Sequence, residues 1–358
     1  MNGPPAQRLT PANIALVIGS IVAALIVLEL GARLVRGPSA LLDWHNIILK
    51  ERIETRNSRV GRVVPDRALG FVNTPDYRSQ DINYDVHGFR VAPNPDGLPL
   101  AEPPLLVVGD SLAHGDEVSD AEAWPALLQQ KLRRRVLNAA LTGYGLDQIV
   151  LRAEKVMAAI RPAAIVLSFA ADDARRNEMK RVWGAEKPYF EWVDGKLVLR
   201  NSPVPASPPA AATLDLWQWA FGWSVLIDAV LRHKGWQYEW SIDHARVLPR
   251  GEGLAVSCAL LRRLAPLRLP TLVVAEYNRY VFENAEHAAE VRATTRAILA
   301  CAAEAGFAVF DTFDTVAEAV RQKGIDAVFR SSHPGPEGAR IAAAAIAGAI
   351  AEHRLLAQ

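Results

Sequence analysis

Short apolar stretches alternate with segments of helical periodicity from Pro103 to the C-terminal region. The apolar stretches have the length of strands and occupy residues 105–108, 136–139, 164–169, 271–275 and 308–310. The helical segments lie near residues 121–134, 147–161, 285–304, 314–322 and 336–353. This alternation predicts parallel βαβ units and an open three-layer α/β/α sheet. Because such sheets bind ligands beyond the carboxyl ends of their strands, the Gly109-Asp110-Ser111 segment after the first strand is a candidate site.

The chain divides into three regions. Residues 1–37 form a tail and an apolar anchor, residues 38–102 an irregular or β-rich lead-in, and residues 103–358 the main domain. An insertion at about 174–265 interrupts the main domain, and Asp194-Gly195 within an alternating stretch predicts a hairpin over 189–199. The aromatic segment 217–240 is interpreted as a core-facing amphipathic helix with a cap. A lid with sugar-stacking aromatics and a membrane-surface contact are the alternatives.

The N-terminal stretch Ile14–Leu28 contains no charged residue. Extended to residues 12–35, it is long enough to cross a bilayer, and Glu29 and Arg33 can pair near one end. A single-pass anchor is therefore predicted, with a cleaved signal peptide and a buried soluble helix as the alternatives. The few flanking basic residues slightly oppose export of the C-terminal part, although long domains can cross regardless of this bias.

The overall composition excludes several classes of function. A formal net charge of +1, spread along the chain, gives no surface for nucleic acid. The two cysteines, Cys258 and Cys301, lack the spacing of a zinc site, so no metal is expected. They can pair if the domain is extracytoplasmic, but spacing alone leaves the pairing open.

Four separated blocks resemble the GDSL, or SGNH, hydrolase family. They are Gly109-Asp110-Ser111-Leu112, the segment Asn138–Gly143, the segment Ser168–Asp173, and His333-Pro334 before an alanine-rich helix. The resemblance covers roughly residues 103–353, and the anchor and lead-in are similar to a membrane-anchored bacterial branch. It implies a flavodoxin-like sheet and a cofactor-free serine hydrolase or acyltransferase. Ser111 would be the nucleophile, His333 the general base, and the Ser111 and Gly143 backbone N–H groups the oxyanion donors.

Two positions depart from the family pattern. The third block ends in asparagine in the family, and here Asp172 stands at the position of that oxyanion donor. The residue three places before the histidine is Arg330 instead of the aspartate that orients the imidazole. Asp326 is the first candidate for a substitute acid, with Glu337, Ser331, Ser332 and a backbone carbonyl as further acceptors. Among the remaining polar residues of the Ser111 loop, His114 is interpreted as a structural residue or a residue at the rim of the site. Asp116 and Glu117 are interpreted as part of a solvated loop.

The resemblance implies action on acyl esters, including acetyl esters, of cell-surface carbohydrate or glycolipid, through an acyl-enzyme on Ser111. The departures at Asp172 and Arg330 leave open weak activity, or a catalytically impaired protein that binds a glycan or an envelope-assembly partner. The expected location is the membrane, with the catalytic domain on the periplasmic or extracytoplasmic side. The sequence does not identify a protein partner.

Overall fold

The computed structural model describes residues 10–94, 96–97, 99–205 and 213–356. Two compact units are present. One combines Met1–Asn57 with Ala210–Asp243, and the other combines Ser58–Pro209 with His244–Gln358. The tail expected at residues 1–9 lies outside the described residues. The larger unit contains every block of the predicted hydrolase site, and the smaller unit contains the candidate membrane helix.

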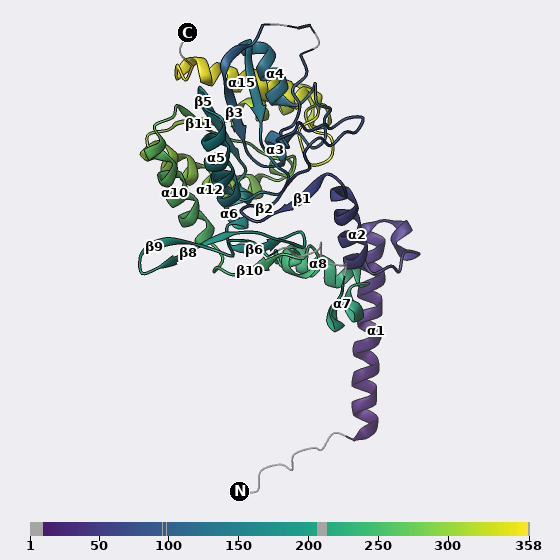
Figure 1. Ribbon diagram of the computed structural model, residues 1–358. Coiled ribbons are helices and arrows are strands. Elements are labelled where there is room, and N and C mark those ends of the chain that lie inside the picture. The colour runs from purple at the N-terminus through teal and green to yellow at the C-terminus, as the bar shows by residue number, and fades with distance from the viewer. Residues whose placement is uncertain (1–9, 95, 98, 206–212, 357–358) are drawn as a thin grey trace. The chain divides into compact units, whose positions relative to one another are not determined.

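A five-stranded parallel sheet forms the centre of the larger unit (Figure 1). Its strands are β3 (Ala101–Val108), β4 (Arg134–Asn138), β5 (Ala164–Phe169), β11 (Thr271–Ala275) and β12 (Ala308–Asp311). The spatial order is β12-β11-β5-β3-β4, with parallel pairing throughout. This order confirms the predicted open α/β sheet and its flavodoxin-like arrangement. The direction of chain winding changes between β3 and β5, so the loops after these two strands diverge and leave room for a ligand.

Helices cover both faces of this sheet. The covering helices are α4 (Trp124–Leu132) and α15 (Pro336–Glu352) on one face, and α5 (Leu146–Ala159), α10 (Glu252–Leu264) and α12 (Ala285–Glu304) on the other. Along β3, Leu105 and Val107 pack in the core beneath α4 and α15. Leu106 and Val108 pack in the core on the other face, beneath α5, α10 and α12. All four side chains are fully buried, which explains why the strand reads as an unbroken apolar run.

Further elements of the larger unit lie mainly in the lead-in and the insertion, and all but α13 are short. They are β1 (Val63–Asp66), β2 (Gly70–Asn73), α3 (Ser111–His114), α6 (Ala171–Arg176), β6 (Met179–Val182), β7 (Ala185–Glu186), β8 (Tyr189–Val193), β9 (Lys196–Arg200), β10 (Ala245–Arg246), α11 (Tyr280–Glu283), α13 (Phe313–Lys323) and α14 (Ile325–Val328). The predicted hairpin is confirmed as β8 paired with β9. Asp194 and Gly195 both have positive φ at its tip, as a type I′ turn requires.

The smaller unit consists of helices. They are α1 (Pro11–Arg36), α2 (Ile47–Arg59, which continues two residues into the larger unit), α7 (Leu216–Phe221), α8 (Val225–His233) and α9 (Gln237–Trp240), with the 3₁₀ turn η1 (Pro38–Leu41). Helix α1 is long and apolar enough to cross a membrane. The core-facing interpretation of the aromatic segment is wrong for α7, where Trp217 and Trp219 are exposed. This helix has only six residues, and the side chain that it buries is Gln218, which donates to the Trp240 carbonyl.

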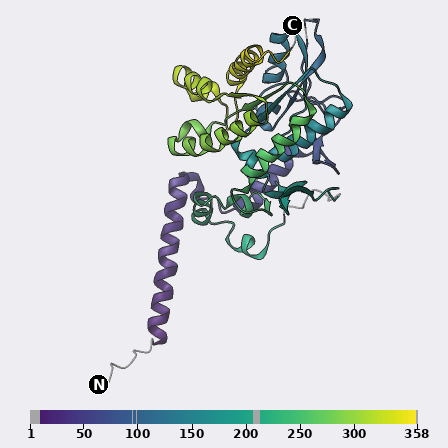
Figure 2. The same cartoon turned by 90° about the vertical axis from the view of Figure 1, so that its left-hand side faces the viewer.

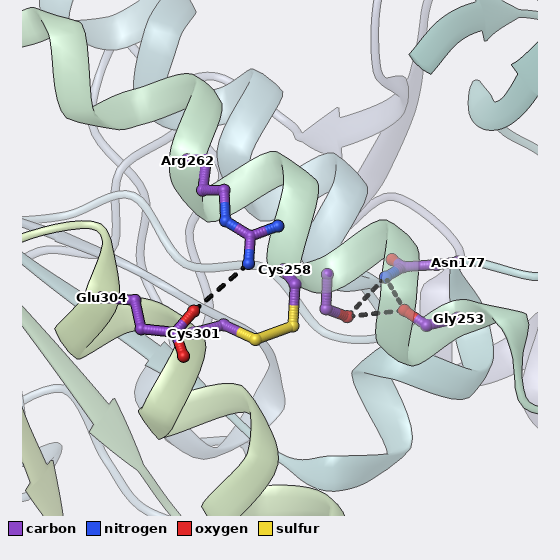
Figure 3. The surroundings of a disulfide bond; sticks show 7 residues. Asn177, Gly253, Cys258, Arg262, Cys301 and Glu304 are labelled. Atoms are coloured by element: carbon purple, nitrogen blue, oxygen red, sulfur yellow. Dashed lines mark hydrogen bonds and ion pairs between the residues drawn. A yellow bond between two sulfur atoms is a disulfide. The ribbon is translucent and has the colours of Figure 1, made fainter. Parts of the chain in front are cut away.

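A disulfide between Cys258 and Cys301 joins α10 to α12 on one face of the sheet (Figure 3). The same two helices are linked by an ion pair between Arg262 and Glu304, at 3.3 Å. The pairing that the sequence left open is therefore present, and it closes a chain segment of 43 residues.

We expect the double variant Cys258→Ser/Cys301→Ser to lose about 3–4 kcal/mol of unfolding free energy, since a cross-link of this span restricts the unfolded chain. Chemical denaturation followed by near-ultraviolet circular dichroism measures the loss. Dithiothreitol should lower the stability of the natural chain toward that of the variant and leave the variant unchanged. Equal stability of both proteins under oxidising conditions would contradict this role of the bridge.

Candidate active site

The Gly109-Asp110-Ser111 segment turns sharply out of β3 into the single helical turn α3. Asp110 caps this turn, because its carboxylate accepts a hydrogen bond from the Leu112 N–H at 3.0 Å. Gly109 packs against neighbouring chain: a Cβ at this position would lie 2.7 Å from the Ala113 Cβ and 3.1 Å from the Ser168 carbonyl oxygen. The glycine therefore allows the turn to pass close to β5 while it presents Ser111.

Ser111 and His333 meet at the carboxyl edge of the sheet. The Ser111 Oγ lies 2.8 Å from the His333 Nε2, although 222 residues separate the two in sequence. His333 follows α14 in the loop before α15, and the backbone pairing of Phe329 with Pro334 shapes that loop. The sequence-predicted serine and histidine are thus within hydrogen-bonding distance.

The other imidazole nitrogen of His333 contacts Ser332 and Glu117. The Nδ1 atom lies 2.8 Å from the Ser332 Oγ and 3.2 Å from the Glu117 Oε1. Glu117 also accepts hydrogen bonds from the Ser331 N–H at 2.7 Å and the Ser332 N–H at 3.2 Å. Burial raises the pKa of Glu117, but its hydrogen bonds from His333 and Ser331 outweigh burial and hold the pKa well below its usual range. The carboxylate beside His333 is therefore ionised.

Asp326 does not occupy this place, and the prediction of Asp326 as the orienting acid is wrong. Its carboxylate pairs with Arg279 at 2.6 Å and is 85 % exposed. Glu337, another alternative, pairs with Lys323 and Arg340. Ser332, which the sequence also allowed as an acceptor, does contact the imidazole. The carboxylate that contacts the imidazole belongs instead to Glu117, six residues after Ser111 in the same loop.

Arg90 holds the loop between Ser111 and Glu117. Its buried guanidinium donates to the carbonyl oxygens of His114 at 2.7 Å, Gly115 at 2.5 Å and Val118 at 2.6 Å, and to the Asp120 carboxylate at 2.8 Å. These bonds satisfy the hydrogen-bonding requirement of buried backbone carbonyl groups on both sides of Glu117. The lead-in thereby fixes the part of the main domain that carries the acid.

Gly143 lies in the loop after β4 with a φ of +86°. A Cβ at this position would lie 2.4 Å from the Trp183 Cζ3, so the ring of Trp183 packs directly on the glycine. Within the described residues, the backbone N–H groups of Ser111 and Gly143 donate no hydrogen bond to the protein. These two donors are therefore available to a substrate oxygen.

His114 and Asp116 link the loop of Ser111 to the loop of Gly143. The His114 Nδ1 lies 2.6 Å from the Asp116 carboxylate, which also accepts from the Thr142 hydroxyl at 2.6 Å. The His114 Nε2 contacts the Tyr84 hydroxyl at 2.9 Å. Burial lowers the pKa of His114, so this imidazole stays neutral. Its arrangement agrees with the structural interpretation drawn from the sequence.

Asp172 cannot donate to an oxyanion. It pairs with Arg175 at 2.6 Å and with Arg176 at 2.7 Å. Burial raises the pKa of Asp172, but these two guanidinium groups outweigh burial and lower it well below its usual value. An ionised carboxylate has no proton to give, so the assignment of Asp172 to the oxyanion hole is wrong. Both guanidinium groups are thus engaged in ion pairs with this carboxylate and with neighbouring groups.

A buried glutamate lies under the site and was missed by sequence reasoning. Glu276, directly after β11, accepts hydrogen bonds from the Ser168 hydroxyl and from the Trp124 indole N–H. Burial raises the pKa of Glu276 to about 8, so the group is largely protonated at neutral pH. It therefore adds little negative charge to the surroundings of Asp110 and His333.

A cavity of about 430 Å³ opens beside the Glu117 carboxylate. Its lining is mostly polar and consists of Asp81, Ile82, Asp116, Glu117, Val118, Ser119, Glu122, Arg330 and Ser331. Arg330, which replaces the family aspartate, thus lines the cavity and does not contact the imidazole. The cavity offers several hydrogen-bonding groups, and it adjoins the site through Glu117, since Ser111 and His333 are not among the residues that line it.

Comparisons with known proteins add family and fold relationships. Residues 107–341 match the GDSL-like Lipase/Acylhydrolase family. Thioesterase 1/protease 1/lysophospholipase L1 of Escherichia coli is 32 % identical over 75 residues, which are 20 % of this chain and 36 % of that protein. The chain thus matches about a third of the length of that curated relative.

Solved structures resemble the chain at low sequence identity. An α/β hydrolase from the metagenome of Lake Arreo matches with a TM-score of 0.45 at 13 % identity, over 73 % of this chain and 100 % of that one. An acetyl xylan esterase from Geobacillus stearothermophilus matches with a TM-score of 0.45 at 15 % identity, over 72 % and 98 %.

Proposed function

Because the chain belongs to the GDSL-like lipase/acylhydrolase family, we propose that it is a serine esterase or O-acyltransferase with Ser111 as nucleophile and His333 as general base. The observation that carries this proposal is the 2.8 Å contact between the Ser111 Oγ and the His333 Nε2, with Ser332 and Glu117 on the other imidazole nitrogen. A serine hydroxyl becomes nucleophilic when a positioned base takes its proton.

In this mechanism the His333 Nε2 accepts the Ser111 proton while the Oγ attacks the acyl carbonyl carbon. The carbonyl oxygen gains negative charge and accepts hydrogen bonds from the Ser111 and Gly143 N–H groups. The imidazolium is stabilised by Glu117 and then returns its proton to the leaving alkoxide, which departs as an alcohol. Water or a second alcohol then gives a proton to His333 and attacks the acyl-enzyme carbonyl carbon. The bond to Ser111 breaks, the imidazolium returns the proton to the Ser111 Oγ, and a carboxylic acid or a new ester leaves.

The proposed substrates are acyl esters of carbohydrate or glycolipid, with acetyl esters as the first to test. Two features support this class. The Trp183 ring against Gly143 restricts the space beside the oxyanion donors, which suits a small acyl group. The cavity that adjoins Glu117 is lined by carboxylates and Arg330, which can hydrogen-bond to the hydroxyl groups of a sugar.

We propose a single-pass membrane location with the catalytic unit outside the cytoplasm. The disulfide supports an oxidising compartment. Retention of α1, rather than cleavage as a signal peptide, is supported by Glu29, which is buried and accepts hydrogen bonds from Ser224 and Val225 almost 200 residues later. Cleavage would remove the acceptor of the Val225 and Leu226 N–H groups at the start of α8.

The decisive test uses the purified full-length chain in detergent. We expect a fluorophosphonate probe to label it and O-acetylated xylooligosaccharide to release acetate, and transfer of the acetyl group to an added sugar acceptor would identify the acyltransferase. A folded protein that neither reacts with the probe nor releases acetate would contradict the proposal. The second candidate function, an impaired site that binds a glycan, would then be favoured by the ion-paired Asp172, which removes one oxyanion donor of the family.

Gly143→Ala tests the second oxyanion donor. Because alanine is strained at a φ of +86° and its Cβ would meet Trp183, we expect the N–H to move and kcat for an acetyl ester to fall on the order of 100-fold. Gly195→Ala is a matched control, since Gly195 also has positive φ but has nothing within 4 Å of an added Cβ. Equal kcat values for both variants would show that strain alone, and not the donor, accounts for any change.

A further inference from the structure

Tryptophan is concentrated in the smaller unit. That unit contains about a quarter of the chain but six of its nine tryptophans, which are Trp44, Trp217, Trp219, Trp223, Trp236 and Trp240. On α7, Trp217 is 63 % exposed and Trp219 is 69 % exposed, and the adjoining Leu216 is 70 % exposed. Contiguous exposed apolar side chains of this size mark a surface that contacts another phase or another molecule. None of these residues belongs to the catalytic machinery.

The start of α8 is fixed to the last turns of α1. Glu29 accepts hydrogen bonds from the Ser224 hydroxyl at 2.7 Å and from the N–H groups of Val225 at 2.9 Å and Leu226 at 3.0 Å. Arg33 pairs with Glu29 at 2.7 Å and donates to the Trp223 carbonyl at 2.7 Å. Both charged side chains are buried in these contacts. Figures 1 and 2 accordingly show α7 and α8 beside the C-terminal part of α1.

The position of this junction along α1 matches a membrane boundary. Glu29 lies eighteen residues after Pro11, a distance of ~27 Å at the helical rise, whereas the hydrocarbon core of a bilayer is about 30 Å thick. Trp44 lies at the same junction, with the Arg33 guanidinium 3.8 Å above its ring. Tryptophan is the side chain that concentrates at the boundary between hydrocarbon and water, because its ring is apolar and its N–H needs a polar partner.

We infer that Trp44, Leu216, Trp217, Trp219 and Phe221, which we term the aromatic shelf, lie in the interface of the bilayer where α1 leaves it. This inference rests on the proposed membrane span. The lipid interface is the indicated occupant because Arg33 of the helix that would cross the bilayer contacts the Trp44 ring of the shelf. Arg33 and Glu29 also bind Trp223 and Val225, which closely follow α7. Two segments whose nearest ends, Arg36 and Leu216, are 180 residues apart in sequence would then form one anchor, with α1 across the membrane and α7 along its surface.

Spin labels on introduced cysteines test this arrangement in the full-length chain. Natural cysteines do not compete, since Cys258 and Cys301 are paired. We would label Leu216→Cys on the shelf, Leu16→Cys within α1, and Val86→Cys as an exposed aliphatic control on the larger unit. Each protein is placed in nanodiscs of phosphatidylcholine and phosphatidylglycerol, and collision with oxygen and with a water-soluble nickel chelate is measured by electron paramagnetic resonance.

We expect the oxygen-to-nickel collision ratio at Leu216→Cys to be severalfold above that at Val86→Cys and below that at Leu16→Cys. A water-like ratio at Leu216→Cys, with a bilayer-like ratio at Leu16→Cys, would overturn the shelf while the span stands. A water-like ratio at Leu16→Cys would overturn the span itself, and the shelf with it. Low collision with both reagents at Leu216→Cys would mean that protein, and not lipid, covers the shelf, which also overturns the inference.

Discussion

Replacing Ser111 with alanine is expected to lower kcat/KM for an acetyl ester by at least about 10⁴-fold, because the substitution removes the atom that would form the acyl-enzyme. It should also abolish labelling by a fluorophosphonate. The Ser111 side chain makes its hydrogen bond with His333, and the helical turn α3 is capped by Asp110 rather than by the serine. The variant should therefore keep the melting temperature of the natural chain.

Ser39→Ala is the matched control for this experiment. Ser39 is an exposed serine of the smaller unit, far in sequence from the four family blocks. This variant should keep both labelling and turnover. If Ser111→Ala retained either property while folded, the nucleophile would be another residue and the proposed mechanism would be wrong.

The sheet was predictable from sequence because its strands are buried on both faces. Two strands, at 164–169 and 271–275, have the predicted bounds, since each is a buried, largely apolar run that begins within two residues after a proline. The first strand begins four residues earlier than predicted, at Ala101, where its side chains are exposed and carry no apolar signal. Helix α10 was not predicted, because it lies inside the insertion, where the regular alternation of strands and helices is lost.

The contact between Ser111 and His333 was predictable because each residue stands in a short motif, at a strand end or before the last helix. The contact of Glu117 with His333 was not predictable, because it spans 216 residues and depends on how the loop after Ser111 folds back. Arg90 in the lead-in determines that fold, through bonds to carbonyl oxygens that no sequence motif reveals. The ion pairs of Asp172, in contrast, were predictable from sequence, since Arg175 and Arg176 lie three and four residues later in the same helix.

The substitution Glu117→Gln distinguishes between Glu117 and Asp326 as the acid that orients His333. Glutamine keeps the size of the side chain but removes the charge that stabilises the imidazolium, and its amide can donate to the Nδ1 atom and favour the wrong tautomer. We expect the plateau of kcat/KM at high pH to fall about 10²–10⁴-fold, with the smaller loss if Ser332 alone keeps the tautomer. Asp326→Asn, which changes the acid suggested by sequence, should leave the plateau unchanged.

The pH profile gives a second, independent readout of the same pair. Burial lowers the pKa of His333, but the Glu117 hydrogen bond and the charges of Asp116 and Asp110 outweigh burial and raise it above its usual value. Since the base must be neutral to take the Ser111 proton, activity should rise as pH passes upward through this raised pKa. Removing the Glu117 charge lowers the pKa of His333 and moves the acid limb to lower pH. The deficit of Glu117→Gln should therefore shrink on the acid side, whereas a shifted limb in Asp326→Asn would return the role to Asp326.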